Sequence, residues 1–86
     1  MTIGDVKVTI RKGDQALDMA RMSIEKASAK LADASALALA TLHDSERGEA
    51  QQSREALREA ADEVDLVLRR IVAAKNHAAA YLTAIG

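Results

Sequence analysis

Apolar residues recur at seven-residue intervals along most of the chain. In the first half, one set is followed three residues later by a second set of small residues: Leu17, Ile24, Leu31 and Ala38, then Ala20, Ala27, Ala34 and Thr41. In the second half the same spacing returns in two longer sets: Ala50, Leu57, Val64, Ile71, Ala78 and Ile85, then Ser53, Ala60, Val67, Ala74 and Tyr81. This spacing is typical of the apolar stripe of a coiled-coil helix. The pattern predicts two amphipathic helices, over about residues 14–43 and about residues 46–84.

A polar stretch at residues 44–48, which ends in Gly48, separates the two predicted helices. A short polar connection favours helices that fold back antiparallel. A bend centred between Ser45 and Glu46 places Leu17 opposite Ala74 and Ala27 opposite Val64, and it gives every stripe residue of the first helix a stripe residue of the second. We therefore expect an all-α fold, a two-helix antiparallel coiled-coil hairpin.

The first thirteen residues follow another rule. Val6, Val8 and Ile10 alternate with polar residues, and this period of two is typical of a β-strand. The prediction is a short strand or arm over residues 1–13, a break at Gly13, and a helical hairpin over residues 14–86 with Asp14 as its N-cap. A single strand leaves backbone groups unpaired, so this strand would pair with another chain; a flexible arm is the alternative.

Many apolar residues lie off the predicted helix–helix interface. Leu37, Leu39 and Leu42 point in three directions around one helix, so one partner helix does not cover them all. Scattered apolar surface residues are the alternative explanation. We favour hairpins that oligomerise into a helical bundle, with these candidate interface residues: Val6, Val8, Ile10, Met22, Leu37, Leu39, Leu42, Leu66, Leu68, Val72, Tyr81 and Leu82.

Composition narrows the function classes. The 86 residues include no Cys, Pro, Trp or Phe, and 12 Lys and Arg balance 13 Asp and Glu. The lack of Cys excludes disulfides and thiolate chemistry, and the near-zero charge argues against nucleic acid as a partner. Charged residues interrupt every apolar stretch, so no membrane span is expected. No basic and then apolar leader pattern follows Met1. We expect a cytoplasmic protein, with export without a cleaved signal left open.

Candidate chemistry is sparse. His43 and His77 would lie roughly 45 Å apart along a helix, too far to share a metal ion within one chain. The acidic residues between Glu55 and Asp65 alternate with Arg residues, as on a solvated, ion-paired helix face. We expect no catalytic, metal or cofactor-binding residues and no small-molecule substrate, and therefore no enzyme.

In architecture, residues 14–86 resemble the WXG100-like, ESX-type helical hairpins of type VII secretion systems. Those are short, Ala-rich chains of two antiparallel helices that act as dimers. The chain departs from the family at its Trp-x-Gly turn, where it reads Asp44-Ser45-Glu46-Arg47-Gly48, and at the C-terminal Tyr-x-x-x-acid export signal, where Ile85 follows Tyr81. The ending, residues 81–86, is also similar to that of uncharacterised short helical proteins of actinobacteria.

These observations favour a non-enzymatic protein–protein interaction module. The expected partners are other copies of the chain and a further protein, for which the hairpin would serve as adaptor, chaperone or secretion partner. The alternative is a structural subunit of a self-assembling bundle or filament.

Overall fold

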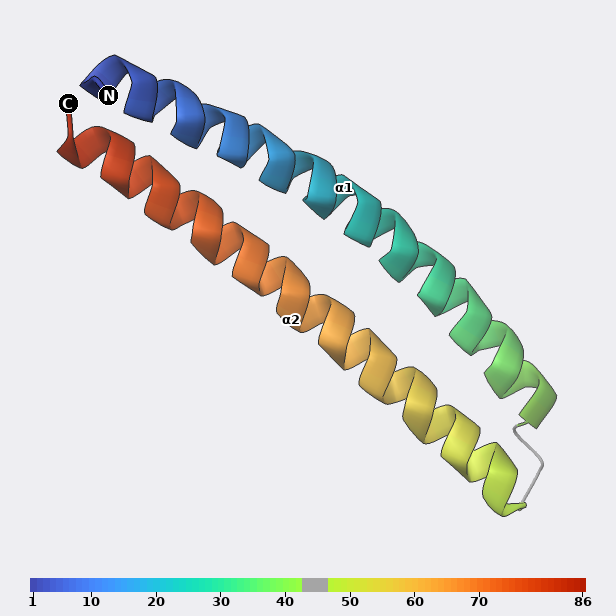
Figure 1. The fold of residues 1–86 in the computed structure, drawn as a ribbon. Coiled ribbons are helices and arrows are strands. Elements are labelled where there is room, and N and C mark those ends of the chain that lie inside the picture. The colour runs from blue at the N-terminus through green and yellow to red at the C-terminus, as the bar shows by residue number, and fades with distance from the viewer. Residues whose placement is uncertain (43–46) are drawn as a thin grey trace.

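The computed structural model describes residues 1–42 and 47–86, which form two helices (Figure 1). Helix α1 spans Ile3–Leu42 and helix α2 spans Gly48–Ala84. They run antiparallel, so that the N- and C-termini lie together at one end of a rod measuring 63 × 16 × 16 Å (Figure 1). The prediction of an all-α helical hairpin is confirmed.

The prediction of a strand or arm at residues 1–13 is wrong, because Val6, Val8 and Ile10 lie within α1. Asp14 is likewise not an N-cap but an interior residue of the helix. Thr2 occupies the N-cap position instead. The Asp5 backbone N–H donates to Thr2 Oγ1 at 3.1 Å, and the Thr2 backbone N–H donates to Asp5 Oδ2 at 3.1 Å. This reciprocal pair is a capping box, and it satisfies two backbone donors at the start of α1.

Two physical reasons explain why residues 3–13 form a helix and not a strand. A helix satisfies its backbone groups within the segment, whereas a lone strand leaves them unpaired. Ile3 and Ile10 also extend the seven-residue spacing of Leu17 back to the start of the chain. Gly13 does not break the helix; it lowers helix propensity by about 1 kcal/mol relative to Ala, which neighbouring turns of a 40-residue helix tolerate.

The extended α1 makes the two helices nearly equal in length, at 40 and 37 residues. The N-terminal segment lies beside the last turns of α2, where Arg11 and Asp14 border the same shallow hollow as Ala78 and Leu82. At the other end Gly48, expected in the bend, is already helical, and the Arg47 carbonyl accepts the backbone N–H of Ala50 at 3.1 Å. His43, Asp44, Ser45 and Glu46 lie outside the described residues.

The first apolar set of each predicted helix faces the other helix. All its members are buried or half-buried: Leu17, Ile24, Leu31, Ala38, Ala50, Leu57, Val64, Ile71, Ala78 and Ile85. The seven-residue spacing therefore identified the centre of the helix–helix interface correctly.

The second set is placed only partly where the sequence predicts. Ala27 and Ala34 are exposed, and α1 instead turns Ser28 and Ser35 toward α2. Thr41, Ser53, Val67 and Tyr81 are exposed as well. On a helix, the positions three residues before and three residues after a central residue flank it equally, so a small rotation exchanges them. An Ala methyl group contributes little buried area, and long side chains such as Leu68 and the stem of Lys75 fill the other flank.

Candidate interaction surface

The hairpin has almost no closed core. Among the described residues only Ala50 and Ile71 are buried, at 5% and 8% exposure. The chain exposes 6557 Å², whereas a compact folded protein of 9.2 kDa exposes about 4,900 Å². Two helices alone bury one stripe each, and the remaining sides stay open to solvent.

Four of the twelve predicted interface residues are half-buried at positions that face the other helix: Val6, Ile10, Leu68 and Leu82. Seven are exposed: Val8, Met22, Leu37, Leu39, Leu66, Val72 and Tyr81. The side chain of Leu42 lies outside what the structure describes. The structure brings Leu68 and Val72 together beside one hollow on α2. Met22 and Leu37 lie on α1, at different positions around the helix and away from that hollow. The twelve residues therefore do not form one continuous surface.

A two-helix rod has two broad faces, one on each side of the plane that contains both helices. The charged face is defined by two columns of residues spaced seven apart: Arg11, Asp18, Glu25, Ala32 and Leu39 on α1, and Gln51, Arg58, Asp65, Val72 and Ala79 on α2. Leu39 and Arg58 border one hollow, and Arg11 and Ala79 border another, so the two columns lie on the same side.

Ion pairs cover much of this charged face. Arg21 lies 3.6 Å from Asp18 and 3.7 Å from Glu25, and Arg69 donates to Asp65 Oδ2 at 2.6 Å. Such exposed i,i+3 and i,i+4 pairs contribute little to stability but keep the face hydrated. The sequence-based expectation of a solvated, ion-paired helix face agrees with this geometry around Asp65.

Among the described residues, the opposite face carries two columns without a charged side chain, and we call it the uncharged face. Its columns are Val6, Gly13, Ala20, Ala27, Ala34 and Thr41 on α1, and Ser53, Ala60, Val67, Ala74 and Tyr81 on α2. Ile24, Ala27, Ala60, Val64 and Val67 border one hollow there, with Glu63 at its edge. The two columns thus form a mostly small, apolar strip along both helices.

One polar cluster lies within the helix–helix interface. The Lys75 ammonium on α2 donates to Asp14 Oδ2 at 3.3 Å and to Asp18 on the next turn of α1. Its side chain is 20% exposed. The predicted register places Ala16, the midpoint of this turn, opposite Lys75, so the cluster agrees with the register. A parallel or a shifted pairing of α1 and α2 would separate these charges. We therefore interpret the cluster as an interaction that favours the observed antiparallel register.

The cluster shifts the pKa values of its members. The hydrogen bond from Lys75 is the main cause that lowers the pKa of Asp18 below its ordinary value of 3.8, against a smaller opposing effect of desolvation. The hydrogen bond to Asp18 is likewise the main cause that raises the pKa of Lys75 above 10.5. Each partner therefore stabilises the charged form of the other.

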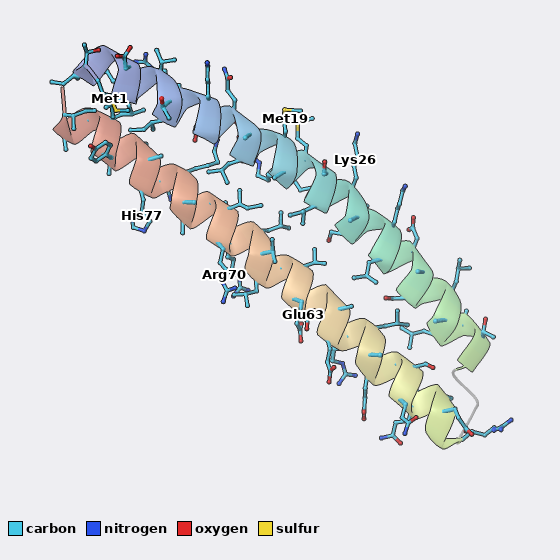
Figure 2. All side chains as sticks on the ribbon, in the orientation of Figure 1. Met1, Met19, Lys26, Glu63, Arg70 and His77 are labelled. Carbon is cyan, nitrogen blue, oxygen red and sulfur yellow. The ribbon has the colours of Figure 1, made fainter. Side chains whose placement is uncertain are left out.

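The remaining candidate side chains do not converge. Figure 2 shows Met19 and Lys26 on the side of α1 remote from α2, and His77 on the side of α2 remote from α1. Within residues 1–42 and 47–86, no group of three or more His, Cys, Asp or Glu residues is arranged to hold a metal ion. Neither α1 nor α2 contains a stretch long and apolar enough to span a membrane.

Sequence reasoning missed the uncharged face because it assigned Ala27, Ala34 and Val67, which are exposed, to the helix–helix interface. A usable signal was present: this column has no charge on either helix, whereas the column on the other flank carries Asp14, Arg21, Arg54 and Lys75. Two uncharged columns per helix mark a stripe wider than one partner helix covers.

Comparisons of the chain with protein-family models, with curated proteins and with solved structures found no match. The resemblance to WXG100-like hairpins thus stays a prediction, and two antiparallel helices alone do not distinguish that family from others.

Proposed function

We propose that this chain is a non-catalytic protein–protein interaction module, a helical hairpin that is completed by other copies of itself and that presents its outer surface to a further protein. The single observation that carries the proposal is the thin core: two buried residues in the described chain, beside many exposed large apolar side chains. Apolar surface in excess of what a monomer needs is typical of interaction sites.

The size of the chain supports the same proposal. An 86-residue hairpin buries too little apolar area to be stable by a wide margin, and small domains commonly gain the missing stability by oligomerisation. The exposed apolar residues occur on both helices and along most of their length, from Val8 to Tyr81. The WXG100-like resemblance suggests a more specific form of the proposal, in which the dimer is a secretion partner.

The test is the mass and the thermal stability of the purified protein as functions of concentration. We expect light scattering to give a multiple of 9.2 kDa at micromolar concentration. The unfolding temperature should rise with concentration, because association stabilises the folded form by mass action. A 9.2 kDa species whose unfolding temperature is independent of concentration would contradict the proposal.

A further inference from the structure

We infer that the uncharged face is the docking surface for a second copy of the chain, so that two hairpins stack on this face as a four-helix bundle. This inference rests on the proposed function and assigns it a particular face and a particular occupant. The face is not the surface that the twelve sequence-predicted residues define, since only Val6 and Tyr81 belong to both.

Charge distribution selects this face over the other. A two-fold interface brings the same surface patch of each copy together, so charged side chains in the centre of that patch would be buried in both copies. The uncharged face has no charge in its two central columns, whereas the columns that flank the contact line on the charged side carry Asp14, Arg21, Arg54 and Lys75. Stacking two charged faces would desolvate these side chains together with their ion pairs, which is costly.

The area also fits a second copy. A rod of 63 × 16 Å presents a face of about 1,000 Å², so two stacked copies would bury on the order of 2,000 Å² in total, above the ~1,200 Å² at which stable interfaces begin. The hairpin exposes about 1,600 Å² more than a compact chain of its mass. One such contact covers about 1,000 Å² of each chain and would therefore remove more than half of this excess.

Side-chain size allows a close approach. Ala20, Ala27, Ala34, Ala60 and Ala74 make most of the face shallow, and the distance between packed helices follows the size of the side chains between them. The hollow between Ala27 and Val67, bordered by Ile24 and Val64, then receives side chains of the second copy. Lys30, Glu63 and Arg70 flank the face with both signs of charge, so opposite charges are available across a two-fold axis.

The test compares charge insertion on the two faces. Ala27→Glu and Val67→Glu place a carboxylate in the uncharged face; Ala32→Glu and Val72→Glu are their controls in the charged face. Val67 and Val72 are similarly exposed, at 39% and 45%, and both alanines are exposed on α1. Mass is measured by sedimentation and helix content by circular dichroism at matched concentrations of each full-length variant.

We expect the two uncharged-face variants to weaken the dimer about ten-fold or more, while the two controls retain the wild-type mass. If dissociation also unfolds the hairpin, mass and helical signal should fall together, and only in the uncharged-face pair. Dimers that survive Ala27→Glu and Val67→Glu, or that dissociate only with Ala32→Glu and Val72→Glu, would overturn the inference and leave the proposed function intact. A monomeric wild-type protein would overturn both.

Discussion

The cluster of Lys75 with Asp14 and Asp18 shows how single residues set the arrangement of the hairpin. Coiled-coil stripes with identical seven-residue spacing also fit when shifted by one heptad, so apolar packing alone specifies the register weakly. A lysine that bridges two carboxylates one turn apart has its partners only in one register. Loss of these contacts should therefore affect the uniqueness of the fold more than its total stability.

At the scale of single residues, we predict that the stability of the folded hairpin depends on pH. Since the folded state lowers the pKa of Asp18, its contribution is present above the unfolded value near 3.8 and is lost as the pH falls through the folded value. Since Lys75 has a raised pKa, its contribution is lost only as the pH rises through a value above 10.5. Unfolding temperatures of wild type and Asp18→Asn should thus differ at neutral pH and converge below about pH 4.

Asp33→Asn is the matched control, because Asp33 lies on the exposed side of α1. Its unfolding temperature should follow the wild type through neutral pH. A constant difference between wild type and Asp18→Asn down to pH 2 would show that the hydrogen bond to Lys75 is not the cause of the lowered pKa.

At the scale of the element, α1 is a continuous helix across Gly13. The residue is exposed, and a Cβ built on it meets no atom within 4 Å. Nothing in the hairpin therefore requires glycine at this position. The strand prediction treated Gly13 as a break between a strand and a helix, a position at which alanine would be unfavourable. The helix and the strand therefore predict opposite effects of a Gly13→Ala substitution on stability.

Gly13→Ala should stabilise the protein by about 0.4–1 kcal/mol, because alanine restricts the unfolded chain and favours the helix. Thermal or denaturant unfolding followed by circular dichroism gives the change. Ala16→Gly, at an exposed position one turn later, is the reciprocal control and should destabilise by a similar amount. Destabilisation by Gly13→Ala would indicate either a break in the helix or a second chain packed tightly against this residue.

At the scale of the whole molecule, the hairpin is held by a narrow line of side chains. Ile71 is the one large apolar residue of the described chain that is buried, and it lies in the second half of α2. Most other large apolar side chains remain half-buried or exposed. The folded state of the hairpin thus depends strongly on a few contacts along this line.

Ile71→Ala should destabilise the protein by about 2–4 kcal/mol, since it deletes a buried side chain and leaves a cavity. Leu66→Ala, on the exposed side of α2 at 44% exposure, should change stability by less than about 0.5 kcal/mol. Chemical denaturation of both variants measures the difference. Equal costs for the two would show that Leu66 is buried in the assembled protein and that the hairpin is not the unit of stability.

Local sequence determined the helices, the bend between them and the central line of contacts. The seven-residue spacing from Leu17 to Ala38 and from Ala50 to Ile85 is long enough to specify helix without tertiary context. Placing the bend in the polar segment also predicted which residues of the two helices face each other. The hydrogen bond between Lys75 and Asp14 agrees with that register. At the N-terminus the alternation of Val6, Val8 and Ile10 misled, because a short period-two pattern competes poorly with helix propagation from a capped start at Thr2.

Only the tertiary structure decided how each helix is rotated about its own axis. Columns on either side of Leu31 are equally spaced from the contact line, and the sequence favoured the alanines over Ser28 and Ser35 because they are more apolar. Packing favoured the opposite flank, because Leu68 and the stem of Lys75 bury more area there than a row of methyl groups does. That rotation leaves Ala27, Ala34 and Val67 exposed on the uncharged face, while Ala20, Ala60 and Ala74 stay half-buried beside the contact line. The sequence of one helix does not determine this rotation, because the preference between two flanking columns depends on the side chains of both helices.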